Sequence, residues 1–377
     1  MDLLSLLHLP VTAAVFYALP FLAALMVIVF IHEFGHFIVA RWCGVTIEAF
    51  SIGFGREITG WYDRHGTRWK LSWIPLGGYV KFLGDANPAS MPDANVAPDV
   101  MRDPGNFHTK PVWQRAAVVV AGPVANFILA IVIFTCGYAF VGLPYQPPLV
   151  AEVLQGSAAM KAGIVAGDMI VSIDSKKIKR FQDIQEAMLF SDGEVLAIVV
   201  ERKGSELKFQ ITPQEMQETD AYGRVSKAAL LGVKSPGPDA VLIERLPLPE
   251  AGAKAFERTG HMIFTTLEYI GRIFTGKENG SQIGSVIKIA SITHDAASAG
   301  PFEFVLIIGF ISVSIGLINL FPIPMLDGGH LVFYAIEAVL GRPLGANAQE
   351  WGFRIGFSLV IMLMAVGLLN DIGWITK

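Results

Sequence analysis

Four long apolar runs dominate the pattern of hydrophobic and polar positions along the chain. They extend roughly from Phe16 to Ala40, Ala116 to Leu143, Phe302 to Phe321 and Gly352 to Leu369. Each run is long enough for a helix that crosses about 30 Å of hydrocarbon, and a helix satisfies its own backbone hydrogen bonds there. The pattern therefore predicts a multi-pass α-helical membrane protein with four transmembrane helices.

The segment between the first two runs has a different pattern. Residues 47–82 are rich in β-branched and aromatic residues, with a turn at residues 64–66, which predicts a membrane-associated β-hairpin. An interfacial aromatic belt with Trp61, Trp69 and Trp73 as anchors is the alternative, and the two can coexist. Residues 85–99 are rich in Pro, Ala, Asn and Asp, which predicts a linker.

The region between the second and third runs has the composition of a soluble α+β domain followed by a helix. Within residues 248–274, apolar side chains recur at helical spacing, which predicts an amphipathic helix on the outer leaflet or against the preceding domain. Those on one side are Phe256, Ile263, Phe264, Leu267 and Ile270. The predicted divisions of the chain are residues 1–46, 47–112, 113–145, 146–240, 241–300 and 301–377.

Composition and charge support a membrane protein and give its orientation. The chain of 377 residues is 53% hydrophobic and 16% charged, with a mean hydropathy of +0.50, too apolar for an ordinary soluble fold. Residues 1–40 contain no Lys or Arg, so the basic start of a signal peptide is missing. The basic segment that follows is expected in the cytoplasm, which places both termini and residues 146–240 outside. A net charge of −4 gives no footprint for nucleic acid.

The first apolar run contains the sequence HEFGH at residues 32–36. Residues four apart lie on one face of a helix, so His32 and His36 can bind one metal ion with Glu33 beside it, as in zincins. A catalytic zinc usually has a third protein ligand. Near the end of the third run, NLFPIPMLDGGH offers Asp327 and His330, and spacing alone does not choose between them. The only cysteines, Cys43 and Cys136, predict neither a disulfide framework nor a Cys-rich zinc site.

These motifs together resemble a known family. HEFGH, the sequence GPVANF at residues 122–127 and NLFPIPMLDGG resemble the site-2 protease family of intramembrane zinc metalloproteases, in particular its bacterial regulator-of-sigma-E protease branch. The soluble region resembles a PDZ domain, although some members of that branch carry two and this chain has room for one. The residues that carry the PDZ resemblance are Ser157, Ala162, Gly163, Gly167, Asp168, Ile170, Ile173 and Asp174.

The family resemblance implies specific roles for site residues. It implies that His32, His36 and Asp327 bind Zn²⁺ and that Glu33 is the general base and proton shuttle. It also implies that Asn319 holds the substrate backbone, with a purely structural link between helices as the alternative. Asn126 is compatible with either role.

The same resemblance implies an enzyme of the bacterial inner membrane whose PDZ-like domain and termini are periplasmic. Its expected substrates are transmembrane segments of single-pass proteins, such as anti-sigma factors or signal-peptide remnants, after an earlier cut by a site-1 protease. The hairpin would offer an edge to the substrate, and the PDZ-like domain would bind peptide or exclude large substrates. A metal transporter and a catalytically silent PDZ scaffold are the alternatives; few polar residues in the spans disfavour the first, and the intact Glu33 disfavours the second.

Overall fold

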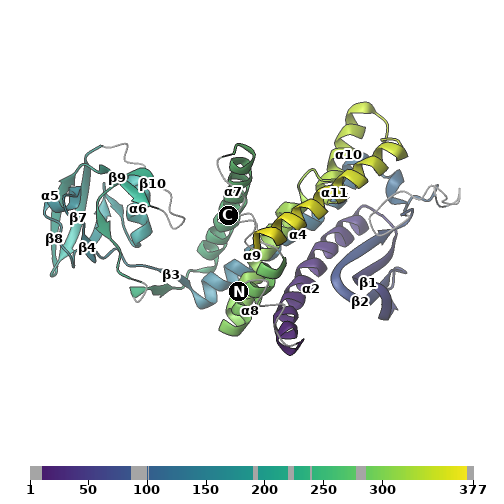
Figure 1. Ribbon diagram of the computed structural model, residues 1–377, viewed down its shortest axis with the longest axis horizontal. Coiled ribbons are helices and arrows are strands. Elements are labelled where there is room, and N and C mark those ends of the chain that lie inside the picture. The colour runs from purple at the N-terminus through teal and green to yellow at the C-terminus, as the bar shows by residue number, and fades with distance from the viewer. Residues whose placement is uncertain are drawn as a thin grey trace. The chain divides into compact units, whose positions relative to one another are not determined.

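The computed structural model describes residues 11–85, 100, 102–189, 194–219, 225–237, 240–276 and 286–371 (Figure 1). The chain forms two compact units. The first combines Met1–Gly137 with Leu248–Lys377, and the second is Tyr138–Pro247. The predicted linker at residues 85–99 lies outside the described residues, apart from Asp85.

The predicted four spans are confirmed in the first unit. Within the described residues, four helices contain stretches long and apolar enough to cross a membrane: Phe16–Trp42, Val112–Val141, Pro301–Asn319 and Asn347–Leu369. The helices themselves are α2 (Val11–Trp42), α4 (Val112–Cys136, continued by a π-helical turn over Gly137–Val141), α9 (Pro301–Asn319) and α11 (Ala346–Asp371).

Helix α4 packs against both α2 and α9. Small residues allow these close approaches, as is common between helices in membranes. A Cβ atom at Gly35 of α2 would overlap the backbone of Ala121, and one at Gly316 of α9 would lie 3.1 Å from the carbonyl oxygen of Pro123. The position of α4 along its two neighbours is therefore fixed by these glycines.

The predicted hairpin is present as β1 (Ile47–Tyr62) and β2 (Arg68–Phe82), joined by a turn at residues 63–67. Both strands fold back on themselves, because Phe50 pairs with Val80 on one side and with Trp69 on the other. Residues 78–82 therefore form an edge of this small sheet, and no other described strand pairs with them. A Cβ atom at Gly78 would lie 3.2 Å from Glu33 Cγ, so this edge runs against α2.

The aromatic-belt interpretation needs one correction. Trp61 and Trp73 are exposed, but Trp69 packs against Phe37 and Phe50, with ring centroids 5.1 and 4.4 Å away. Trp69 is therefore part of the contact between the hairpin and α2.

Three further α-helices lie in the described part of the first unit. They are α7 (Leu248–Phe274), α8 (Val286–Ala299) and α10 (Asp327–Leu340). Helix α7 is the amphipathic helix that the sequence predicts, whereas α8 and α10 were not predicted. Helix α7 packs against α4, and its buried residues are the small Ala251, Ala255 and Thr259, while Phe256 and Phe264 are exposed. The aromatic side of α7 is thus left for lipid or another surface.

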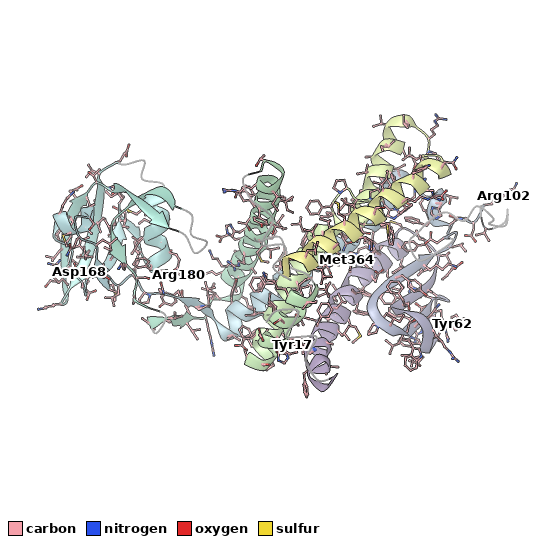
Figure 2. All side chains as sticks on the ribbon, viewed as in Figure 1. Tyr17, Tyr62, Arg102, Asp168, Arg180 and Met364 are labelled. Atoms are coloured by element: carbon pink, nitrogen blue, oxygen red, sulfur yellow. The ribbon has the colours of Figure 1, made fainter. Side chains whose placement is uncertain are left out.

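The second unit is an α+β structure. Its central sheet has the order β6-β5-β7-β8, and a core of buried aliphatic residues such as Ile170, Ile198 and Val200 holds α6 against it. The buried Asp168, labelled in Figure 2, pairs with Arg202 of β7. The sheet strands are β5 (Met169–Ile173), β6 (Lys176–Lys177), β7 (Leu196–Arg202) and β8 (Ser205–Ile211), with helices α5 (Ala158–Ala162) and α6 (Phe181–Leu189).

Six short strands complete the second unit in antiparallel pairs. They are β3 (Leu143–Tyr145) with β12 (Leu242–Glu244), β4 (Glu152–Val153) with β11 (Val233–Lys234), and β9 (Gln214–Thr219) with β10 (Val225–Leu230). The PDZ identity of this unit remains a prediction.

Candidate metal centre

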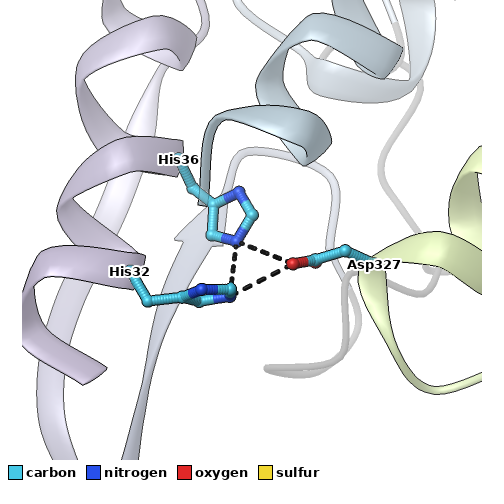
Figure 3. A group of neighbouring side chains, drawn as sticks. All are labelled: His32, His36 and Asp327. Atoms are coloured by element: carbon cyan, nitrogen blue, oxygen red, sulfur yellow. Dashed lines mark hydrogen bonds and ion pairs between the residues drawn. The ribbon is translucent and has the colours of Figure 1, made fainter. Parts of the chain in front are cut away.

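Helix α2 places two histidines on one face. His32 and His36 are both buried, and their Nε2 atoms are 3.2 Å apart (Figure 3). This is the geometry that the four-residue spacing predicts for two ligands of one ion.

Asp327 reaches the same point from the opposite end of the chain. Its Oδ2 atom lies 3.1 Å from His32 Nε2 and 3.5 Å from His36 Nε2. Among the described residues, His32, His36 and Asp327 form the one cluster of three side chains whose ligand atoms all lie within 4.8 Å of one another. His330 is outside this cluster, so geometry favours Asp327 as the third ligand.

Two glycines after Asp327 explain how the backbone brings its carboxylate close to the two histidines. A Cβ atom at Gly328 would overlap the carbonyl oxygens of Leu320 and Phe321, and one at Gly329 would overlap that of Ile323. The loop after α9 therefore folds tightly onto the start of α10. Asp327 is the first residue of α10, where the helix dipole also favours its negative charge.

The three side chains fit a zinc ion. Two imidazole nitrogens and one carboxylate oxygen are a common ligand set of catalytic zinc, which keeps a fourth position open. The buried Oδ2 atom of Asp327 has no hydrogen-bond partner in the described part of the chain, although two histidine nitrogens lie nearby. A cation bound between the three atoms would satisfy this oxygen, whose burial otherwise costs free energy.

Helix α4 supplies the next layer of contacts. His36 Nδ1 lies 2.8 Å from the carbonyl oxygen of Val118, so Nδ1 donates and Nε2 keeps its lone pair for the metal. His32 Nδ1 lies 3.2 Å from the side-chain nitrogen of Asn126. A Cβ atom at Gly122 would overlap His36 Nε2, so only glycine leaves room for both rings there.

A cavity of about 180 Å³ opens beside the three ligands. Glu33 lines it, and so does the edge of β2 at Gly78, Tyr79 and Val80. The backbone of Val80 hydrogen-bonds to the Glu33 carboxylate. A carboxylate, a three-ligand cation site and a strand edge that pairs with no other described strand therefore face one cavity.

All the site residues predicted from sequence meet at this cavity. His32, Glu33, His36, Asp327 and Asn319 line it. Asn319 Nδ2 donates to the carbonyl oxygen of Ile315 in its own helix at 3.0 Å, so its proposed role toward substrate depends on its oxygen. His330 lines the same cavity without joining the ligand cluster.

The sequence did not predict the contacts to the histidines that arise from packing between α4 and α2. It assigned no role to Val118 or Gly122, and it found no partner for Asn126. The motif GPVANF was the available signal, because a glycine and an amide one turn apart lie on the same face of α4.

Comparison with known proteins agrees with this geometry. The sequence model of peptidase family M50 matches residues 20–363. A protein of Agrobacterium fabrum that is assigned as a zinc metalloprotease is 44% identical over 360 residues, which cover 94% of this chain and 95% of that protein. Metalloprotease MmpA of Caulobacter vibrioides is 41% identical over 377 residues, covering 93% of this chain and 94% of that protein. The chain therefore belongs to peptidase family M50, the site-2 protease family.

Proposed function

We propose that the protein is a zinc metalloendopeptidase that cleaves transmembrane segments of single-pass membrane proteins. The observation that carries this proposal is the convergence of His32, His36 and Asp327 beside Glu33 in helices of a membrane-spanning unit. Relatives assigned as zinc metalloproteases, at 44 and 46% identity, support zinc as the metal.

In this proposal His32, His36 and Asp327 hold the zinc ion. Zinc bound there supplies a Lewis acid for the scissile carbonyl and lowers the pKa of water. Glu33 accepts the proton of the attacking water and then donates it to the leaving amine, as a general base and acid. Both transfers take place in the cavity that Glu33 lines.

The edge of β2 is proposed to hold the substrate. A transmembrane helix hides its carbonyls in its own hydrogen bonds, so it must unwind before hydrolysis. An unwound segment can pair with an exposed strand edge, and residues 78–80 offer one on the wall of the cavity. Asn319, which lines the same cavity, is proposed to hold the substrate backbone through its side-chain oxygen.

The cellular setting is proposed from the family and the charge pattern. We infer an enzyme of the bacterial inner membrane that acts on anti-sigma-factor-like proteins or signal-peptide remnants after a site-1 protease has trimmed them. The second unit, resembling a PDZ domain and placed in the periplasm, would bind peptide or exclude substrates with large outer domains.

The decisive test is Glu33→Gln in the full chain, reconstituted with a membrane-embedded reporter peptide. The amide keeps the size of the side chain but accepts no proton, so cleavage should fall by at least 100-fold, as expected for loss of a general base, while bound zinc stays near one ion per chain. Product mapping by mass spectrometry measures the first and elemental analysis the second. Cleavage at the wild-type rate would reject Glu33 as the base. Absence of zinc from the wild type would reject the proposal that the protein is a zinc enzyme.

A further inference from the structure

Two buried side-chain oxygens in the described residues have no hydrogen-bond partner: Oδ2 of Asp327 and Oδ1 of Asn126. The proposed zinc accounts for the first. Asn126 is fully buried on α4, and zinc bound to the three ligands does not by itself account for its amide oxygen. An unsatisfied buried acceptor costs about 1–3 kcal/mol, so the orientation of this amide needs a reason.

The side-chain nitrogen of Asn126 contacts a histidine of the metal centre. Nδ2 of Asn126 lies 3.2 Å from Nδ1 of His32, while Nε2 of the same ring lies 3.1 Å from Oδ2 of Asp327. An imidazole binds a metal through a nitrogen that carries no proton, and a neutral ring then carries its proton on the other nitrogen. When His32 binds zinc through Nε2, its Nδ1 is therefore a donor and needs an acceptor.

The amide nitrogen cannot accept a hydrogen bond from Nδ1–H, but the amide oxygen can. A half turn of the Asn126 amide about its Cβ–Cγ bond exchanges Oδ1 and Nδ2. Oδ1 has no hydrogen-bond partner among the described residues in its present position, so the rotation breaks only the contact between Nδ2 and His32 Nδ1. The tautomer of His32 therefore decides which end of the amide faces its Nδ1.

We propose that Asn126 is a positioning residue for the metal centre: its Oδ1 accepts a hydrogen bond from the Nδ1–H group of His32 when zinc is bound. This contact fixes the tautomer in which Nε2 of His32 faces the metal. One proton moves from Nε2 to Nδ1 of the same ring, so the charge of the ring does not change.

The backbone around Asn126 is built to hold this position. Ser312 of α9 donates a buried hydrogen bond of 2.8 Å to the carbonyl oxygen of Asn126. A Cβ atom at Gly316 would lie 3.2 Å from that of Asn126, so α9 supports α4 closely at this point. The Nδ1 atom of His36 likewise has an acceptor on α4, the carbonyl oxygen of Val118. Helix α4 thus sets the outer nitrogen of both histidines, as supporting residues commonly do in zinc sites.

Asn126→Leu and Asn126→Asp separate positioning from packing. Leucine has a similar size and no acceptor, so zinc affinity should fall about 10–100-fold, the usual cost of losing such a contact. Aspartate restores an acceptor, so affinity should stay at or above that of the wild type. Competition with a chromophoric chelator measures the affinity of the purified full chain, without reference to activity.

The rise in unfolding temperature on adding zinc gives a second readout, because a ligand that binds only the folded protein stabilises it by RT ln(1 + [L]/Kd), so a weaker affinity gives a smaller rise at the same zinc concentration. A packing defect lowers the unfolding temperature of the zinc-free protein but leaves this increment unchanged. Thr293→Val is the matched control, since Thr293 is also buried and its hydroxyl donates within its own helix, to Ile289; its increment should equal that of the wild type. A wild-type increment in Asn126→Leu would overturn the proposal. So would an equal loss in Asn126→Asp, and this comparison with the wild type decides the matter if the leucine variant does not fold.

This inference rests on the proposed function, and His32→Ala distinguishes the two failures. If His32→Ala keeps wild-type zinc affinity, the metal centre itself is wrong. If His32→Ala loses zinc while Asn126→Leu keeps it, only the role of Asn126 is wrong.

Discussion

At the scale of single residues, the site depends on Gly122 having no side chain. A Cβ atom at Gly122 would overlap His36 Nε2 and lie 2.9 Å from Cε1 of His32. Both rings are buried, so neither can move aside without disturbing the ligand geometry. The methyl group of alanine would therefore occupy the space in which the metal-binding atom of His36 lies.

Gly122→Ala is accordingly expected to lower zinc affinity by at least tenfold, the lower limit for disturbing the support of a zinc ligand. Chelator competition on the purified full chain measures this. Gly260→Ala is the matched control, because a Cβ atom at Gly260 meets nothing within 4 Å, and its affinity should be that of the wild type. Equal affinities in the two variants would show that the rings tolerate the methyl group.

The residues of the site were predictable to different degrees. His32, Glu33 and His36 lie within one helix, so their spacing alone brings them together. Asp327 lies almost 300 positions away, and its choice over His330 came from the family resemblance. The contact between Asn126 and His32 depends on how far α4 slides along α2. That position is set by close packing at Gly35, which no pattern in a single segment encodes.

At the scale of elements, the bidentate pair between Arg115 of α4 and Glu337 of α10 holds the helix that carries Asp327. Their side chains are only 10% and 14% exposed, and the Arg115 guanidinium lies 4.9 Å from the ring centroid of Tyr334. Removing one partner of such a pair leaves a buried charge without compensation, which costs about 3–5 kcal/mol.

Arg115→Met should therefore destabilise the full chain by about 3 kcal/mol or more, and adding Glu337→Leu should recover much of the loss. Thermal unfolding of the zinc-free protein in detergent measures both. The exposed pair Arg354 and Glu350 on α11 is the control, since Arg354→Met should cost less than about 1 kcal/mol. The pair does not hold α10 if Arg115→Met costs no more than Arg354→Met.

Elements were predicted well where a local pattern determines them. The four spans follow from the length of their apolar runs, and β1 and β2 follow from composition and a turn. Helix α10 was missed because it begins three residues after Pro324, a residue type that interrupts helices, and is too short to span a membrane. The second pairing of Phe50, with Trp69, was missed because alternation along a strand predicts the strand but not its partners.

At the scale of the whole molecule, the second compact unit contains a buried ion pair that makes its stability depend on pH. The second unit contains Asp168, whose side chain is fully buried while its partner Arg202 is 31% exposed. Hydrogen bonds from the Arg202 guanidinium hold the pKa of the Asp168 carboxyl below its usual value, against the opposing effect of burial. Asp168 also accepts a hydrogen bond from the backbone of Val165, so its carboxylate ties the start of β5 to β7.

The sign of the pH effect follows from this lowered pKa. A carboxyl with a lower pKa in the folded than in the unfolded state contributes stability above its unfolded pKa of about 3.9 and loses it as the pH falls through the folded value. The stability that this pair gives the second unit should thus be constant from pH 7 to about pH 5 and decline below about pH 4. Amide hydrogen exchange in β5 and β7 of the full chain, corrected for intrinsic rates, measures this. In Asp168→Asn no carboxylate remains to titrate, so exchange should be faster at pH 7 and the acid-dependent decline should be smaller than in the wild type. An acid-dependent decline of the same size in both proteins would assign the pH dependence to other groups.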